Sequence, residues 1–399
     1  MPVGTPFHDR TLPLAESLSY RDWAGYYAAS SYEPLHEHEY NALRNAAGLI
    51  DISPLFKYLV SGPDAALLVN RVITRDAERL EPGRVIYTPW CDEQGRVLDD
   101  GTVARLDERR FRWTAAEPNY RWIRENAFGL DVTVEDISER VAALALQGPT
   151  SAAVLRAAAQ ADIDGLKYFH VTTGSIDGRP VEISRTGYTG DLGYEIWMAR
   201  EDAIGVWDSL MRAGAPHAIR PVGLLALDVA RIEAGLLLID VDFFSARRAL
   251  TTSQYYTPDE MGLDRLVDLL KPQFIGRSAL VSARAAGVSK RIVGVAIEWT
   301  DVEALYHAVG LPPLGVATAS RAAVPVFAGS RQVGRMTSST WSPILKQMIG
   351  MATIETAFAG VGSRLDVEHT VDVVRHRVRG TVVQTPFFNP RRKTAVPPA

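Results

Sequence analysis

Three glycines, two tyrosines and a glutamate fall within residues 185–197, which read Arg-Thr-Gly-Tyr-Thr-Gly-Asp-Leu-Gly-Tyr-Glu-Ile-Trp. Glycine permits sharp or positive-φ turns, so this backbone can lie close to a flat ligand. Glu195 can accept paired hydrogen bonds from ring N–H groups, while tyrosine rings cover the faces of a planar heterocycle. The pattern indicates a site for a pterin-like ring. The alternative is a glycine-rich turn that leads into a strand, with Ile196 and Trp197 in the core.

Two adjacent carboxylates, Asp99 and Asp100, lie in the second strand of a predicted strand–turn–strand unit, at residues 83–90 and 97–103. Successive side chains of a strand point to opposite faces, so only one of the two can enter a given cavity. That carboxylate could bind a cationic group of a ligand. The alternative is a strand carboxylate that caps the nearby turn at residues 92–96.

Gly187-Tyr188-Thr189-Gly190, followed by Gly193-Tyr194-Glu195-Ile196, resembles the central motif of the folate-dependent aminomethyltransferase superfamily. This group includes the T-protein of the glycine cleavage system and tetrahydrofolate-dependent demethylases. The resemblance implies an α+β, T-protein-like multidomain folate-binding fold, with mixed and antiparallel sheets and a C-terminal β-barrel. It continues through most of the chain, at residues 23–25, 48–53, 144–149, 223–235 and 271–280.

The resemblance also implies tetrahydrofolate as the cofactor and a role for individual residues. Asp100 is the implied catalytic residue, where its charge would stabilise a positively charged nitrogen or sulfur in the transition state. The implied cofactor-binding residues are Tyr87, Tyr188, Glu195, Arg231 and Tyr168. The implied substrate-binding residues are Trp113, Tyr32 and Trp341, the last in a segment, 337–343, that resembles the barrel loop facing the active site in relatives.

The carboxylates of the folate glutamyl tail need cationic partners. Arg231, Arg335 and the pair Arg391-Arg392 are all open candidates. A structural ion pair with no ligand is the alternative for Arg231 and Glu233. No metal site is expected, because the histidines of His36-Glu37-His38 do not share a helix face and no third ligand is evident.

Departures from the T-protein pattern favour the demethylase branch. The segment 111–122 is shorter than in the T-protein, Leu227 stands where T-protein relatives usually carry arginine, and residues 166–169 resemble demethylases. We therefore expect a tetrahydrofolate-dependent methyltransferase, a demethylase that moves a one-carbon group from a small methylated substrate to N5 of tetrahydrofolate. One alternative is an aminomethyltransferase of a glycine-cleavage-type system, which alone would require a lipoyl carrier protein.

A non-catalytic folate-binding protein is the other alternative. Relatives of that kind carry a cysteine-centred motif where this chain has residues 185–188, and the single cysteine, Cys91, lies far away in sequence. The net charge of −4, with no long basic tract, indicates neither nucleic acid nor an anionic membrane surface as a partner. One cysteine, no signal-peptide pattern and no long apolar run predict a soluble cytoplasmic protein.

The length of 399 residues predicts more than one domain. We expect a folate-binding region at 1–285, made of two intertwined α+β subdomains, and a β-barrel domain at 286–390. Predicted helices span 37–47, ending at Gly48, and 151–161, 201–213 and 223–235. A linker is predicted at 281–290, barrel strands at 291–297, 324–327, 332–338, 349–353 and 371–383, and a frayed end at 390–399.

Overall fold

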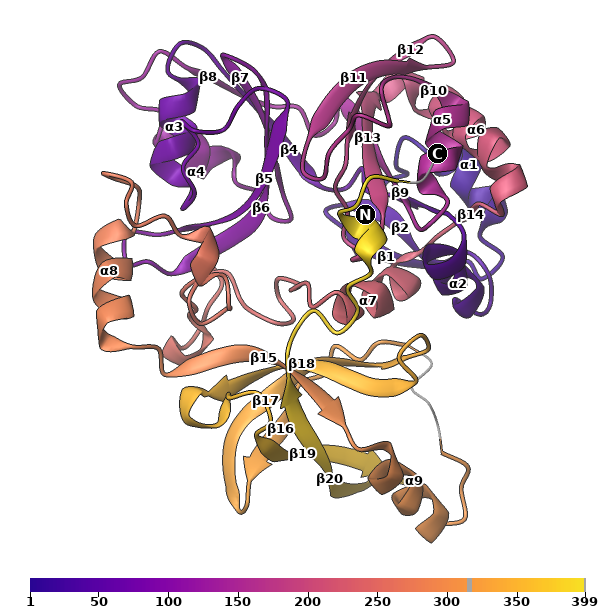
Figure 1. The fold of residues 1–399 in the computed structure, drawn as a ribbon, viewed down its shortest axis with the longest axis vertical. Coiled ribbons are helices and arrows are strands. Elements are labelled where there is room, and N and C mark those ends of the chain that lie inside the picture. Colours follow the sequence, from indigo (N-terminus) through magenta and orange to yellow (C-terminus); the bar gives the residue numbers. More distant parts are fainter. Residues whose placement is uncertain (314–317, 398–399) are drawn as a thin grey trace.

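The computed structural model describes residues 1–313 and 318–397. Figure 1 shows three lobes: a five-stranded sheet, a seven-stranded sheet and, below both, a closed barrel. Helix α7 (Leu224–Glu233) lies where the seven-stranded lobe meets the barrel. The α+β class and the C-terminal barrel predicted from the sequence are confirmed.

The first lobe is an antiparallel sheet that carries Asp100. Its strand order is β5 (Arg84–Cys91), β6 (Val97–Asp107), β7 (Arg110–Ala115), β4 (Phe56–Ser61) and β8 (Thr133–Asp136). Helices α3 (Ala65–Val72) and α4 (Tyr120–Glu125) pack on it. The core between them buries aromatic residues such as Tyr58, Trp90 and Trp113, so this sheet holds its strands at fixed register beneath the site.

The second lobe carries the glycine-rich motif. Its strand order is β10 (Ala159–Gln160), β11 (Val171–Ile176), β12 (Arg179–Ser184), β13 (Gly193–Ala199), β9 (Val141–Gln147), β3 (Gly48–Asp51) and β14 (Arg220–Pro221). The pair β3 and β14 is parallel, and the other pairs are antiparallel. Preceding the lobe are α1 (His8–Thr11) and the hairpin β1 (Ser19–Trp23) with β2 (Tyr26–Ser31).

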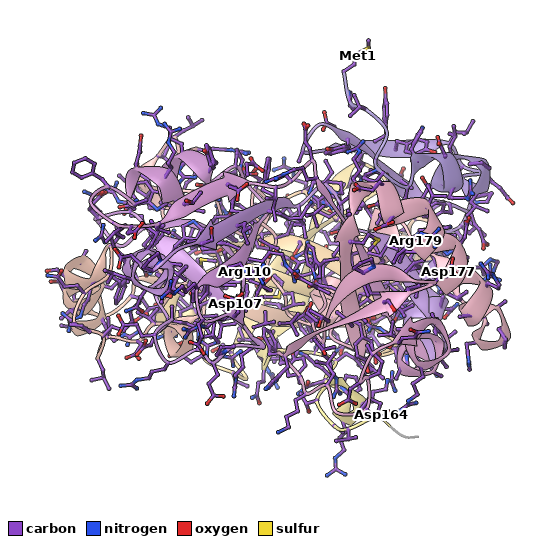
Figure 2. The ribbon with its side chains drawn as sticks, turned by 90° about the horizontal axis from the view of Figure 1, so that it is seen from above. Met1, Asp107, Arg110, Asp164, Asp177 and Arg179 are labelled. Atoms are coloured by element: carbon purple, nitrogen blue, oxygen red, sulfur yellow. The ribbon has the colours of Figure 1, made fainter. Side chains whose placement is uncertain are left out.

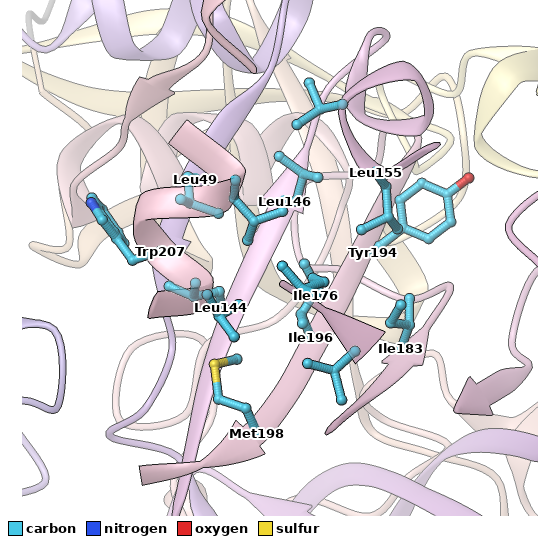
Figure 3. Close-up of a cluster of buried hydrophobic side chains, with 14 of the residues drawn as sticks. Leu49, Leu144, Leu146, Leu155, Ile176, Ile183, Tyr194, Ile196, Met198 and Trp207 are labelled. Atoms are coloured by element: carbon cyan, nitrogen blue, oxygen red, sulfur yellow. The ribbon is translucent and has the colours of Figure 1, made fainter. Parts of the chain in front are cut away.

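Both faces of this sheet are covered by helices, so alternate residues of its central strands enter two cores. Leu144 and Leu146 of β9 meet Trp207 on one side, where α5 (Ser151–Ala158) and α6 (Ala203–Gly214) pack (Figure 3). Ala143 and Ala145 face the other side, where α2 (Glu37–Asn45) and α7 pack. Burial on both faces explains the continuous apolar run of β9.

The barrel closes in the order β15 (Lys290–Ile297), β18 (Gln347–Glu355), β17 (Arg331–Ser342), β16 (Val324–Ala328), β19 (Arg364–Val371) and β20 (Val374–Val383). Closure follows because β15 pairs with both β18 and β20. Helix α9 (Trp299–Ala308) packs against β19 and β20. The domain division expected between residues 285 and 286 stays a prediction.

Three local expectations were wrong. Helix α8 (Arg277–Ala286) extends into the first half of the expected linker at 281–290. Its Leu280 is buried in an apolar cluster that also contains Cys91 and Ile292. Gly48 begins β3 instead of ending α2, and a Cβ there would meet Leu43 Cδ2 at 2.5 Å. The segment 337–342 is strand β17 rather than a loop.

The end of the chain is docked instead of frayed over its described part. A short 3₁₀ turn forms at Arg391–Lys393, and Arg392 pairs with Asp191 at 2.6 Å. Residues 398–399 of the expected frayed end lie outside the described residues. Within the described ranges, no helix combines the length and apolar character that a bilayer crossing requires.

Exposed ion pairs close hairpin turns of both sheet lobes. Figure 2 shows Asp107 and Arg110 between β6 and β7, and Asp177 and Arg179 between β11 and β12. Their N···O distances are 2.5 and 2.6 Å. Exposed pairs contribute at most about 1 kcal/mol each, so the buried cores hold the lobes that position the site.

Candidate functional site

The two adjacent carboxylates of β6 face opposite ways, as the strand period predicts. The Tyr87 hydroxyl donates to Asp100 Oδ2 at 2.5 Å, across the pair of strands β5 and β6. Asp99 is fully buried on the other face, where its Oδ2 accepts from Asn119 Nδ2 at 2.9 Å. Asp99 Oδ1 accepts the Asp100 N–H at 2.8 Å. Asp99 therefore fixes the backbone from which Asp100 projects.

Burial sets the protonation of this pair. It raises the pKa of Asp100 to about 6, while the hydrogen bond from Tyr87 opposes the rise. Burial and then the Asp100 charge raise the pKa of Asp99 well above its usual value. Burial also raises the pKa of Tyr87, which therefore stays a donor. Asp100 is thus a carboxylate at neutral pH that lies close to its own titration.

The glycine-rich stretch connects β12 to β13 and packs on a buried amide. Gln147 Nε2 donates to the carbonyls of Thr186 and Tyr194, at 3.2 and 3.3 Å. A Cβ at Gly187 would lie 2.1 Å from Gln147 Oε1, and one at Gly193 would lie 2.2 Å from it. The backbone of both glycines therefore lies against the Gln147 amide, which a larger side chain would displace. The close approach to a flat ligand that the sequence indicated stays a prediction.

Tyr188 reaches from this stretch toward α7 and Asp100. Its hydroxyl donates to the carbonyl of Leu237. Burial raises the pKa of Tyr188, the nearby Arg231 lowers it, and the charge of Asp100 raises it further. The hydroxyl is therefore within electrostatic range of both groups, which come from different lobes.

Glu195 lies on β13 with its carboxylate held from its own lobe. The Thr186 hydroxyl donates to Glu195 Oε2 at 2.6 Å. Burial raises the pKa of Glu195, whereas hydroxyl hydrogen bonds and the charge of Arg112 lower it. Arg112 belongs to β7 of the first lobe and lies over the Trp197 ring at 4.2 Å. A cation of one lobe thus supports a carboxylate of the other.

Arg231 joins α7 to the barrel. Its Nη1 donates to Asp242 Oδ2 at 2.5 Å, and its Nε donates to Asp228 Oδ1 at 3.3 Å. The hydroxyls of Thr337 and Ser338 each donate to Asp242 Oδ1 at 2.7 Å. The structural ion pair that was the alternative for Arg231 is present. Its buried Nη2, which carries two N–H groups, has no hydrogen-bond partner among the described residues.

The structure brings together Tyr87, Asp100, Tyr188 and Arg231, but it places the predicted substrate-binding residues elsewhere. Trp113 is fully buried, edge-on to Trp90 at 5.0 Å between ring centroids. Tyr32 is buried beside a cavity of about 10 Å³, which has room for about one water molecule. These roles stay predictions, and burial of both rings argues against them.

Trp341 faces away from α7. The neighbouring Ser342 donates to Glu233 Oε1 of α7 at 2.6 Å, and alternation in β17 turns Trp341 to the other face. Its ring packs on Trp299 at 4.6 Å between centroids. Tyr168 packs edge-on against Phe169 at 4.7 Å, at the border of the second lobe, with Lys393 Nζ 6.0 Å from its ring.

Sequence reasoning missed Asp242, Arg112 and Asn119. Asp242 follows the helix motif at 223–235 within ten residues, and its burial beside an arginine could have been suspected from that proximity. Arg112 lies over the Trp197 ring of the other lobe, and Asn119 donates a hydrogen bond to Asp99, the residue before Asp100. Residue spacing in the sequence does not reveal such contacts.

The residues present fit a reduced pterin. Glu195 is a half-buried acceptor for ring N–H groups, and the unpaired Arg231 Nη2 can donate to an acceptor. Asp100 offers a negative charge beside them. The donor and acceptor set therefore suits tetrahydrofolate.

Comparison with known proteins agrees with this geometry. Residues 15–271 match the family model "GCVT N-terminal domain", and residues 307–389 match "Glycine cleavage T-protein C-terminal barrel domain". The aminomethyltransferase of Halothermothrix orenii is 34% identical over 88% of this chain and 90% of its own length. That of Moorella thermoacetica is 34% identical over 93% and 94%.

The solved structure of glycine cleavage system aminomethyltransferase T from Bartonella henselae is also similar. It superposes with a TM-score of 0.81 at 25% identity, covering 98% of this chain and 99% of its own. The fold and site therefore define a tetrahydrofolate-dependent one-carbon transferase. The chain belongs to the glycine cleavage T-protein family, within the folate-dependent aminomethyltransferase superfamily.

Proposed function

We propose that this protein is an aminomethyltransferase of the glycine-cleavage type. In this reaction a lipoyl carrier protein presents an aminomethyl group, ammonia leaves, and methylenetetrahydrofolate forms. The proposal is supported by relatives named aminomethyltransferase that match at least 88% of the chain. The demethylase expectation came from short segments only.

The observation that carries the chemistry is the half-buried Tyr87–Asp100 pair near Tyr188 of the glycine-rich stretch. Tetrahydrofolate, when bound, supplies the nitrogen nucleophile that accepts the one-carbon unit. Ionised Asp100 stabilises positive charge that develops on nitrogen next to that unit, in a site that burial keeps at low dielectric. Tyr87 holds the carboxylate in one orientation and stays protonated.

Binding is assigned to the surrounding residues. Glu195 accepts from pterin N–H groups, and Tyr188 packs against the ring. Arg231 keeps the N–H groups of Nη2 free for a folate acceptor, while its Nη1 pairs with Asp242, which accepts from the barrel hydroxyls of Thr337 and Ser338. Tyr168 keeps its predicted cofactor-binding role, at the border of the second lobe. We assign no ligand contact to Trp113, Tyr32 or Trp341.

Demethylation of a small methylated substrate is the second candidate. It is favoured by Leu227, which stands where T-protein relatives usually carry arginine and packs, 8% exposed, in the apolar cluster on α7. An apolar side chain there removes a charge that a T-protein would present near its ligand. The two candidates differ in donor and in product, so one experiment separates them.

The test is mass spectrometry of the folate products, together with an ammonia assay. Purified protein and tetrahydrofolate are incubated with an aminomethyl-loaded lipoyl carrier protein or, without carrier, with methylamines, sulfonium compounds and methoxyarenes. Carrier-dependent ammonia and methylenetetrahydrofolate are expected, and Asp100→Asn should form both at a much lower rate. A 5-methyl product formed without carrier would replace the proposal with demethylation.

A further inference from the structure

The last described residues of the chain lie across the glycine-rich stretch of the second lobe. We call residues 384–397 the C-terminal strap and residues 185–192 the pterin loop. The strap leaves the barrel after β20 and runs past α7 to the seven-stranded lobe (Figure 1). On the way, the Phe388 N–H donates to the Glu233 carbonyl at 2.8 Å, and Arg44 lies over the Phe388 ring at 4.7 Å.

Arg392 of the strap neutralises the only carboxylate of the pterin loop. Its Nε and Nη2 donate to the two oxygens of Asp191 at 2.6 and 2.8 Å. The Asp191 side chain has no exposed surface, and its other cationic neighbour, Arg44, lies 3.5 Å away. A bidentate arginine–carboxylate pair fixes orientation as well as charge. Asp191 therefore depends on the strap for its main partner.

The cation at the other end of the pterin loop also depends on the strap. Arg185 is 2% exposed, and its Nη2 donates to the carbonyls of Arg392, Lys393 and Ala395. No carboxylate pairs with Arg185 among the described residues. Burial lowers the pKa of Arg185, which is the expected effect of desolvation without a counter-ion. Strap carbonyls thus accept from Nη2 of this buried guanidinium, the Leu166 carbonyl accepts from its Nη1 at 3.3 Å, and its Nε has no partner among the described residues.

Between these two anchors the pterin loop has no helix or strand of its own, since β12 ends at Ser184 and β13 begins at Gly193. The match to the family's barrel domain stops at residue 389, before Arg392. We propose that Arg392 is a positioning residue for reduced folate: through Asp191, and with strap carbonyls on Arg185, it holds the loop that presents Tyr188 in its binding conformation. This inference rests on the proposed pterin site.

The test compares Arg392→Gln with Arg109→Gln in the full chain. Both remove one positive charge, but Arg109 lies in the turn between β6 and β7, is exposed, and its side chain bonds to none of the described residues. Titration calorimetry with 5-formyltetrahydrofolate, a stable reduced folate, should show at least tenfold weaker binding for Arg392→Gln. Arg109→Gln should stay within twofold of wild type. Arg392→Lys should recover part of the loss, because an ammonium can still reach one Asp191 oxygen.

Turnover and hydrogen exchange separate positioning from general instability. KM for tetrahydrofolate should rise in Arg392→Gln while kcat at saturating folate stays within twofold, and exchange should accelerate at amides 186–192. Unchanged folate affinity and unchanged exchange in Arg392→Gln would overturn the inference, as would an equal loss of affinity and protection in Arg109→Gln. If wild type binds no reduced folate, the proposed pterin site fails. In that case, hydrogen exchange at the pterin-loop amides alone tests whether the strap holds the loop. Unchanged exchange in Arg392→Gln would then overturn the role proposed for Arg392.

Discussion

Tyr87→Phe should shift the pH dependence of catalysis to higher pH, while the site still binds its ligand. The hydroxyl of Tyr87 donates to Asp100 at 2.5 Å and opposes the rise that burial causes in the pKa of this carboxyl group, which is about 6. A hydrogen bond to a charged group contributes roughly 1.5–3 kcal/mol. One pKa unit corresponds to about 1.4 kcal/mol. Loss of the hydroxyl should therefore raise the pKa of Asp100 by about 1–2 units.

The catalytic form is ionised Asp100, so activity is present above this pKa and falls as the pH drops through it. The acidic limb of kcat/KM, which reports groups of the free enzyme, should move from about 6 in wild type to about 7–8 in Tyr87→Phe. At pH 7 the ionised fraction should fall from about nine-tenths to between about one-half and one-tenth. Above pH 9 the two enzymes should converge.

The assay is folate-product formation at pH 5–9.5, with Asp100→Asn as the control that removes the limb altogether. An acidic limb at the same pH in Tyr87→Phe and wild type would refute the reasoning. So would a limb that persists in Asp100→Asn, because another group would then control the rate.

Three further changes test the framework of the site. Glu195→Gln should weaken binding of 5-formyltetrahydrofolate roughly 10- to 150-fold in calorimetry, because the loss of a charged acceptor costs about 1.5–3 kcal/mol. Asp242→Asn should destabilise the junction of α7 and barrel by about 3–5 kcal/mol, because it removes the negative charge that pairs with buried Arg231. Faster hydrogen exchange of the β17 amides would show this loss. Gly187→Ala should lower thermal stability by about 1–3 kcal/mol through overlap with Gln147.

Matched controls accompany these variants. Gly360→Ala introduces the same methyl group where the nearest atom, Ser363 Oγ, lies 3.6 Å away, so its melting temperature should match wild type. Asp107→Asn removes a carboxylate from an exposed ion pair and should leave β17 exchange unchanged. If Gly187→Ala melts like Gly360→Ala, the close packing on Gln147 is wrong. If Asp242→Asn leaves exchange unaltered, Asp242 does not join the lobes.

Features that depend on local spacing could be predicted from the sequence. The opposite orientation of Asp99 and Asp100 follows from the strand period. The glycines were expected to bring the backbone close to a ligand, and the structure shows Gly187 and Gly193 packed on the Gln147 side chain instead. The family resemblance supplied the α+β fold and the barrel, because its motifs recur through most of the chain.

Contacts between distant segments could not be predicted in the same way. The charge of Arg112, in another lobe, lowers the pKa of Glu195. Asp242 accepts hydrogen bonds from two hydroxyls of β17, about a hundred residues further along the chain. Aromatic residues are ambiguous for a related reason: Trp113 and Trp341 have the chemistry of ligand-binding rings, but each also packs against a neighbouring tryptophan. Composition cannot distinguish a ring in a core from a ring in a cleft.

The docked strap has a consequence for the order in which the protein is made. Arg392 contacts Asp191 and the carbonyl of Arg44, which lies 348 residues earlier. During synthesis the two sheet lobes leave the ribosome first, with Asp191 and Arg185 still lacking their partners. The pterin loop can therefore be completed only after the final residues emerge, and a nascent chain stalled within the barrel carries a folded sheet lobe with an unfinished binding site.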